Sequence, residues 1–189
     1  MCRHLPDRQT SEGVQDFVKN IVKTNIVTEG IWFYSGFMFA LSFRQRNLMR
    51  NLGTITDWIA RDEALHLKFG IYLILEILEE RSEVLTPEFA KEIREIILEA
   101  VELEVKYNAD LLPNGILGLN TKVINKYVKY VADRRLEELG FEPEFNVDNP
   151  AKWMTTANDT LELVNFFETV NTSYEVNAGG TRGMDKDGK

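Results

Sequence analysis

Three side chains that can bind a metal ion occupy positions where an amphipathic helix normally carries apolar residues. Glu63 and His66 are three residues apart, so on a helix they lie about 60° apart on the same side. They belong to a stripe at helical spacing that begins apolar and turns polar: Ile55, Ile59, Asp62, Glu63, His66, Gly70. Glu29 interrupts a second, apolar face: Val22, Ile26, Phe33, Phe37, Ala40. Both patterns predict that Glu29, Glu63 and His66 point into a helical core.

A buried carboxylate is unfavourable unless it is protonated, paired with a cation or bound to a metal. One Glu on one helix and a Glu-x-x-His on another form half of the ligand set of di-iron and di-manganese helical bundles. Carboxylate oxygens with one imidazole per metal suit iron or manganese better than zinc. Phe33, Phe37 and Ile59 would line such a site and keep it dry.

A buried ion pair is the competing interpretation, with Arg61 or Lys68 as the cation. The only other histidine is His4, and the sequence contains no second Glu-x-x-His. This polypeptide can therefore supply only half of a dimetal site.

Four helices are expected to position these residues, because apolar side chains recur at the helical period between capping residues. The expected ranges are Ser11 to before Asn51, Thr54 to about Arg81 with Asp57 completing a capping box, Thr86 to before Pro113, and Asn120 to Gly140. No alternating stretch of useful length predicts a strand. The predicted fold class is all-α and bundle-like. Residues 1–13 are expected to be irregular, 14–140 to form the bundle portion, and 141–189 to form a C-terminal extension and mobile tail.

Composition excludes several classes of function. The 189 residues include 44% hydrophobic residues, enough for a sizeable core. The 30 acidic against 22 basic residues argue against binding nucleic acid. The apolar run from Gly30 to Phe43 is too short to span a bilayer and is interpreted as a buried helix. The single cysteine, Cys2, excludes an intrachain disulfide and fits a reducing cytoplasm.

Several segments in the same order resemble the small, radical-generating subunit of class I ribonucleotide reductase. ARDEALH (60–66), EGIWFYSGF (29–37) and RNLM (46–49) resemble the second metal-binding helix pair of that family. GLN (118–120), KYVADRRLEELGF (129–141), NPAKWM (149–154) and NFFE (165–168) are similar to its later helix, the loop that follows and the start of its tail. The resemblance covers residues 14–176 and implies the C-terminal half of a ferritin-like helical bundle.

This resemblance implies roles for particular residues. Glu29, Glu63 and His66 match the family's metal ligands, and Asp62 matches its acid on the radical-transfer path. Tyr174 falls where the family has a tail tyrosine that relays the radical to the large catalytic subunit. The family's other ligands and its radical tyrosine have no counterpart here, and the C-terminal GGTRGMDKDGK lacks its apolar, acidic docking peptide.

Three interpretations of the half site remain open. The chain is a split small subunit whose site is completed by a separately encoded N-terminal half, and the assembly supports reduction of ribonucleotides. Alternatively, two copies pair their ligands in a homodimeric dimetal oxidase or metal-storage protein. The third interpretation is an inactive truncated fragment.

Overall fold

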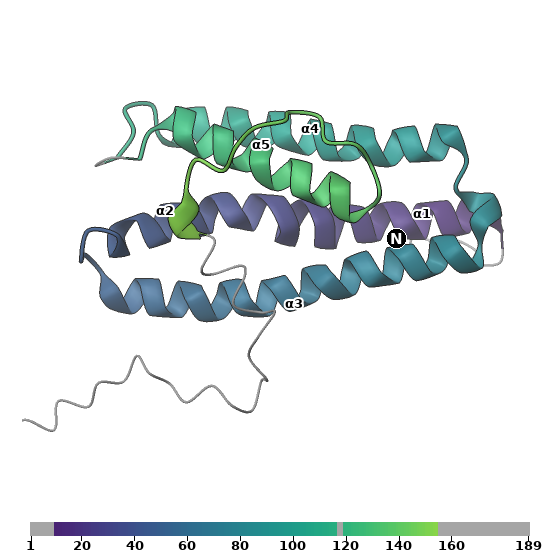
Figure 1. The fold of residues 1–189 in the computed structure, drawn as a ribbon, viewed down its shortest axis with the longest axis horizontal. Helices are drawn as coiled ribbons and strands as arrows, with labels where there is room; N and C mark the ends of the chain where they lie inside the picture. Colours follow the sequence, from purple (N-terminus) through teal and green to yellow (C-terminus); the bar gives the residue numbers. More distant parts are fainter. Residues whose placement is uncertain (1–9, 117–118, 155–189) are drawn as a thin grey trace, which may run out of the picture.

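The computed structural model describes residues 10–116 and 119–154 as a bundle of helices (Figure 1). The elements are α1 (Ser11–Ile21), η1 (Val22–Trp32), α2 (Phe33–Arg44), α3 (Arg50–Glu80), η2 (Ser82–Val84), α4 (Pro87–Leu111), α5 (Thr121–Glu138) and η3 (Lys152–Met154). Within the described residues no strand occurs, and the Ile116–Leu119 bridge is isolated. The predicted all-α class is therefore confirmed.

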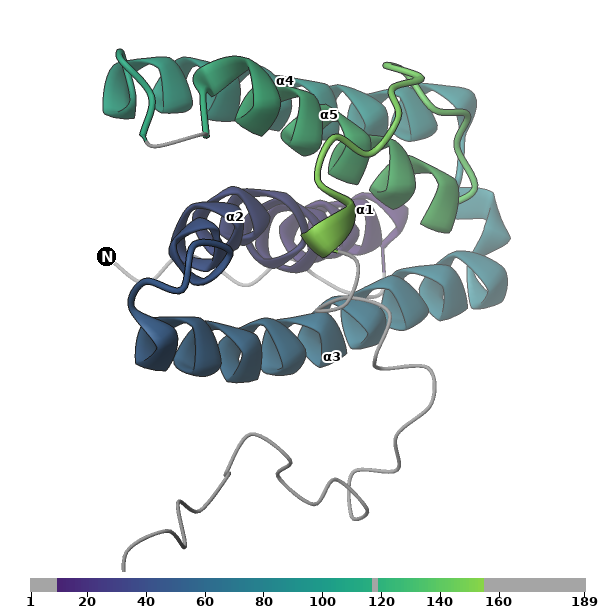
Figure 2. The ribbon, with the colours of Figure 1, turned by 60° about the vertical axis from the view of Figure 1, so that its left-hand side comes forward.

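A continuous helix from α1 through η1 to α2 forms the centre of the bundle. In both views α3 lies on one side of it, and α4 and α5 lie on the other (Figures 1 and 2). Its core contacts include the fully buried side chains of Val18, Val22, Ile26, Ile31 and Met38. Burying one such side chain contributes about 1.5–3 kcal/mol, so this helix is the main anchor of the core.

This central helix is also the part of the described chain that is long and apolar enough to span a membrane. Its most apolar window has a mean hydropathy of 1.3, and 56% of that window is buried inside the bundle. Burial by α3, α4 and α5 is what a core helix requires, in agreement with the interpretation of the 30–43 run as a buried helix.

The helix α3 packs on the central helix through small residues. Its buried positions are Gly53, Thr56, Ala60, Ala64, Leu67, Gly70 and Ile74. The prediction that the stripe from Ile55 to His66 faces the core was wrong, because Ile55 and Ile59 are 50% and 44% exposed. The small side chains let the two helices approach closely. The larger apolar side chains of α3 consequently lie on its outer face.

Two predicted caps were misplaced. Thr10, one residue before Ser11, caps α1 by accepting a 3.1 Å hydrogen bond from Gly13 N–H. The helix α3 begins at Arg50 rather than at Thr54, whose hydroxyl donates to the Arg50 carbonyl within the helix. Asp57 forms an ion pair with Arg44 instead of completing a capping box.

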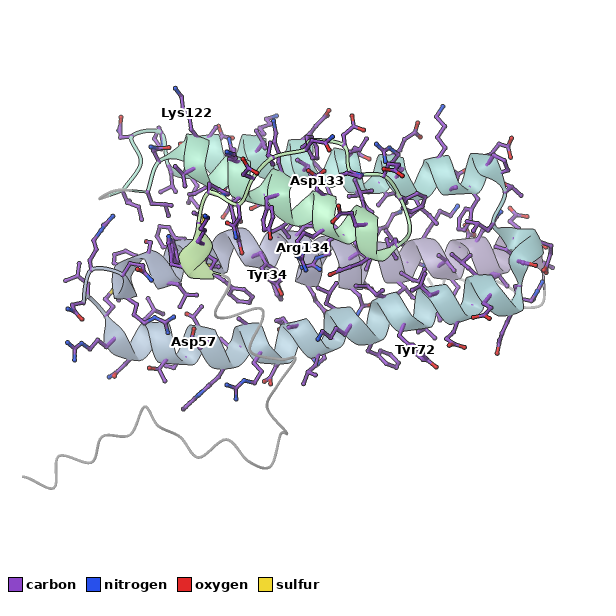
Figure 3. The ribbon with its side chains drawn as sticks, viewed as in Figure 1. Tyr34, Asp57, Tyr72, Lys122, Asp133 and Arg134 are labelled. Atoms are coloured by element: carbon purple, nitrogen blue, oxygen red, sulfur yellow. The ribbon has the colours of Figure 1, made fainter. Side chains whose placement is uncertain are left out.

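The predicted starts of α4 and α5 are confirmed. Thr86 accepts from Phe89 N–H at 3.2 Å, and Asn120 accepts from Val123 N–H at 3.0 Å. Beyond α5, Gly140 adopts a φ of 84°, which favours glycine because a side chain there would be strained. The chain then runs back over α5, where Asp133 accepts hydrogen bonds from the N–H groups of Glu144 and Phe145 (Figures 1 and 3).

Large apolar side chains remain exposed on the outer faces of α3 and α4. They are Ile55, Trp58, Ile59, Leu65, Phe69, Tyr72 and Leu75 on α3, and Leu103, Tyr107 and Leu111 on α4. Figure 3 shows Tyr72 directed away from the bundle. Exposed apolar patches of this kind mark interaction surfaces.

Candidate metal centre

The wide-turn segment η1 carries Glu29. Between Val22 and Trp32 the backbone follows the π-helical pattern, in which each N–H bonds to the carbonyl five residues earlier. The Thr28 hydroxyl donates to the Lys23 carbonyl at 3.0 Å, again five residues back. Such segments interrupt α-helices mostly as single turns and are frequent at functional sites.

Glu29 meets Glu63 and His66 where η1 packs against α3. One ligand atom from each residue lies within 4.8 Å of the others, and His66 Nδ1 is 3.2 Å from Glu63 Oε2. Metal–ligand bonds of about 2.0–2.2 Å place two ligand atoms at most about 4.4 Å apart. Shifts of a few tenths of an ångström would bring all three atoms to one ion, so this donor set fits a metal.

Asn25 bridges the two helices of this cluster. Its side-chain N–H₂ group donates to Glu29 Oε2 at 3.1 Å and to the His66 carbonyl at 3.2 Å. It lies over Gly70, where an added Cβ would come within 2.4 Å of the Asn25 Cβ. Sequence reasoning missed Asn25, although its position four residues before Glu29 was an available signal.

The cluster is more open than the sequence predicted. Glu29 is half-buried, and the side chains of Glu63 and His66 are 17% and 60% exposed. The prediction that His66 points into the core was wrong, because the small-residue stripe of α3 takes that direction. The carboxylates contact Asn25 and His66, and among the ion pairs of the described residues neither carboxylate pairs with Arg61 or Lys68.

The remaining predicted site residues lie elsewhere. Asp62 is on the exposed side of α3 and is not a member of the three-residue cluster. Tyr174 lies outside the described residues. The structure therefore brings together Glu29, Glu63 and His66, and of the residues predicted for radical transfer it describes Asp62 alone, outside this cluster.

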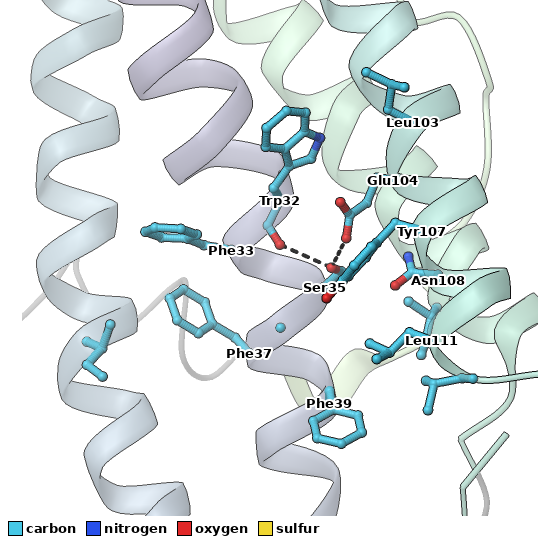
Figure 4. A pocket seen from close by; sticks show the side chains of 14 residues that line it. Trp32, Phe33, Ser35, Phe37, Phe39, Leu103, Glu104, Tyr107, Asn108 and Leu111 are labelled. Carbon is cyan, nitrogen blue, oxygen red and sulfur yellow. Dashed lines mark hydrogen bonds between the residues drawn. The ribbon is translucent and has the colours of Figure 1, made fainter.

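A cavity of about 690 Å³ lies between α2 and α4, one helical turn from the cluster (Figure 4). Phe33, Phe37 and Ile59 line it, as do Glu104 and Asn108 of α4. Phe33 follows Glu29 by four residues and Ile59 precedes Glu63 by four, so the apolar side chains predicted to surround the site do lie beside it.

Polar groups in the wall of this cavity were not foreseen from the sequence. Burial raises the pKa of the Glu104 carboxyl above its ordinary value, and a hydrogen bond with Ser35 opposes this shift. The Ser35 hydroxyl also donates to the Trp32 carbonyl at 3.0 Å (Figure 4). Because the Ser35 hydroxyl carries one proton, its hydrogen bonds to the Trp32 carbonyl and to Glu104 Oε1 are alternatives.

The chain is similar to known proteins in both sequence and structure. The profile of the family "Ribonucleotide reductase, small chain" matches residues 3–150. The ribonucleoside-diphosphate reductase subunit beta of Chlamydia pneumoniae is 48% identical over 167 residues, which are 88% of this chain and 48% of that protein. The ribonucleoside-diphosphate reductase subunit M2 of Homo sapiens is 36% identical over 141 residues, 74% of this chain and 34% of that protein.

Solved structures agree with these sequence matches. The ribonucleotide reductase R2 subunit from Clostridium botulinum superimposes with a TM-score of 0.67 at 30% identity, covering 80% of this chain and 54% of that one. A putative class I ribonucleotide reductase from Bacillus halodurans gives 0.67 at 26% identity, covering 78% and 52%. This chain spans about half, or less, of the length of the proteins that it matches.

Proposed function

Because the chain belongs to the ribonucleotide reductase small-chain family, we propose that it is part of the small subunit of class I ribonucleotide reductase. It would contribute half of a dimetal-carboxylate site that supports radical generation for reducing ribonucleotides to deoxyribonucleotides. Its bundle is part of the ferritin-like helical fold of the solved relatives. The observation that carries the proposal is the convergence of Glu29, Glu63 and His66 within 4.8 Å.

In this proposal Glu29, Glu63 and His66 hold iron or manganese. The bound metal would supply the one-electron oxidation from which the radical arises. Asn25 fixes the Glu29 carboxylate by its hydrogen bond, as groups behind metal ligands commonly do. Phe33 in the neighbouring cavity would help to exclude water.

Asp62 and Tyr174 are proposed to transfer the radical to the large catalytic subunit. The support for Asp62 is its place next to Glu63 on an exposed face of α3, where another polypeptide could approach it. Tyr174 is proposed from the family resemblance alone. The ribonucleotide itself would be bound by the large subunit.

A separately encoded N-terminal half of the small subunit is the proposed partner that completes the site. The exposed apolar faces of α3 and α4 support this proposal, because α3 carries Glu63 and His66 of the cluster and its exposed apolar face continues past them. A polar group of this partner could bond to Asn108, whose buried side-chain N–H₂ group has no hydrogen-bond partner within the described residues. We propose a cytoplasmic location, without binding to a membrane or nucleic acid.

A homodimer is the second candidate, favoured by the 60% exposure of His66. On an open face, a symmetric copy could bring its own Glu29, Glu63 and His66 to the other side of the metals. Such a protein would be a dimetal oxidase or a metal-storage protein. An inactive truncated fragment is the remaining alternative.

Metal stoichiometry combined with native mass tests these alternatives. The chain would be loaded with iron or manganese in the presence and absence of the N-terminal half of a related small subunit. We expect about two metal ions per assembly that contains both halves, and loss of metal with Glu63→Ala. Glu80→Ala removes an exposed carboxylate from the same helix and should leave binding unchanged.

Each result separates the candidates. Metal bound only in the presence of the N-terminal half supports the split subunit. About two metal ions in a dimer of this chain alone support the homodimer. No metal in either mixture, or equal loss with both variants, would reject a metal role for the cluster.

A further inference from the structure

Arg135 occupies a core position of α5. It follows Ile124, Val128 and Val131 at helical spacing, and it is 7% exposed. A guanidinium remains charged at all physiological pH values, so burying it is unfavourable unless its N–H groups are bonded. The groups that bond to its guanidinium therefore indicate the structural role of Arg135.

Those partners connect α5 to the wide-turn segment η1. Arg135 Nε donates to the Gly30 carbonyl at 3.1 Å, and its Nη1 pairs with Glu138 one turn further along α5. The guanidinium carbon lies 5.4 Å from the centre of the Tyr34 ring. These contacts bind and shield the charge from three directions.

Gly30 is shaped to receive this arginine. A Cβ on Gly30 would lie 3.3 Å from Arg135 Cδ and 2.8 Å from Leu67 Cδ1. The absence of a side chain thus lets α5 and α3 approach η1 from two sides at the residue that directly follows Glu29.

The direction of the Gly30 carbonyl depends on the backbone rotation at the residue that follows Glu29. The buried Arg135 donates a hydrogen bond that restricts this rotation, while Asn25, one turn earlier on η1, holds the Glu29 carboxylate. We propose that Arg135 is a positioning residue that holds the π-helical turn and thereby directs Glu29 toward Glu63 and His66. The link to metal binding rests on the proposed function; the restraint on the backbone does not.

Hydrogen exchange of the full chain, followed by mass spectrometry, tests the restraint. Arg135→Gln should exchange about tenfold faster in peptides covering 26–34, with α1 and α4 unchanged. Asp133→Ala is the matched control, because Asp133 is buried on the same helix but bonds the backbone at 144–145. That variant should speed exchange at 141–146 and leave 26–34 unchanged.

Arg135→Lys provides a milder variant if Arg135→Gln does not fold. The lysine ammonium group can reach one acceptor, but it lacks the forked guanidinium that contacts the Gly30 carbonyl and Glu138 at the same time. We therefore expect exchange at 26–34 that is intermediate between the wild type and Arg135→Gln. The inference is overturned if exchange at 26–34 equals that of the wild type, or if it rises equally in every helix.

Manganese affinity of the assembled protein provides the second readout. Arg135→Lys should weaken the manganese affinity about 10–100-fold. Asp133→Ala should leave the manganese affinity unchanged, even if it lowers the melting temperature as much as Arg135→Lys does. If Arg135→Lys keeps wild-type affinity, Arg135 does not position Glu29 for metal. If the wild-type protein binds neither manganese nor iron, the proposed function fails and hydrogen exchange alone decides the restraint.

Discussion

At the scale of single residues, the candidate centre depends on groups that would not touch the metal. Glu29 carries a proposed ligand atom, and its direction depends in our proposal on the hydrogen bonds made by Asn25 and by the Gly30 carbonyl. Such groups contribute through geometry, so their removal should alter affinity more than stability.

Asn25→Ala tests this distinction directly. The substitution removes the bonds from one side-chain N–H₂ group to Glu29 and to the His66 carbonyl. We expect metal affinity to fall about 10–100-fold, with a loss of stability of about 1 kcal/mol. Metal titration and thermal unfolding measure the two effects. Asn20→Ala, at an exposed position of α1, is the control, and equal effects of both variants would contradict the assignment.

The buried carboxyl of Glu104 gives a pH-dependent prediction. Burial raises its pKa in the folded state above the ordinary 4.5, so the native state binds more protons than the unfolded chain between these two values. Its stabilisation is therefore complete below about 4.5 and is lost as pH rises through the folded pKa. The loss is about 1.4 kcal/mol for each unit by which the pKa is raised.

Glu104→Gln should remove this dependence, because the amide stays neutral and its side-chain oxygen can still accept a hydrogen bond from Ser35. Denaturant unfolding from pH 4 to 8 should show the variant gaining stability relative to the wild type as pH rises. A constant difference across this range would mean that Glu104 titrates normally.

At the scale of helices, local signals were predictable and tertiary ones were not. Thr86 and Asn120 were identified because a capping side chain acts within its own turn. The start of α3 was missed because it follows Met49, which is in a left-handed conformation and makes no capping bond. Large apolar residues predicted the wrong face of α3, since Gly53 and Ala60 make the close contacts.

The candidate centre shows the same limit. The grouping of Glu29, Glu63 and His66 could be predicted from residue type and helical spacing, in part because Glu-x-x-His is a local pattern. The π-helical form of η1 could not, because it has no distinct local signal and depends on bonds from Asn25 and Arg135. An arginine at a core position of α5 was the one available sign of the latter bond.

Gly70 is predicted to set the separation of α3 from η1. A Cβ there would lie 2.4 Å from the Asn25 Cβ, so Gly70→Ala should cost about 1–3 kcal/mol through overpacking. Gly36 on α2 has nothing within 4 Å of an added Cβ, and Gly36→Ala should be neutral or stabilise by about 0.5–1 kcal/mol. Chemical denaturation of the two variants compares these values, and similar effects would mean that the helices separate freely.

At the scale of the whole molecule, the described bundle buries its centre but leaves one side of α3 uncovered. His66 of the candidate centre is also exposed on α3, so in our proposal one partner would both cover the apolar face and complete the centre. Folding of the assembly and metal binding should then depend on each other.

Phe69 tests the importance of this face because it is 63% exposed. Phe69→Glu should change the stability of the single chain by less than about 0.5 kcal/mol but should weaken association with the N-terminal half at least tenfold. Analytical ultracentrifugation measures the association. Lys122→Gln on α5 lowers the net charge by the same one unit at an exposed site away from α3 and serves as the control. Equal weakening by both would indicate a general charge effect.

The π-helical segment also determines where the chain tolerates a change in length. Each residue added to or removed from a helix rotates everything beyond it by about 100°. Removing one residue between Val22 and Trp32 would therefore turn Glu29 away from α3 or turn the apolar face of α2 away from the core. The turn at 45–49, which joins α2 to α3, can absorb the addition or removal of one residue without rotating either face. A one-codon deletion should thus be far more damaging in η1 than in this turn.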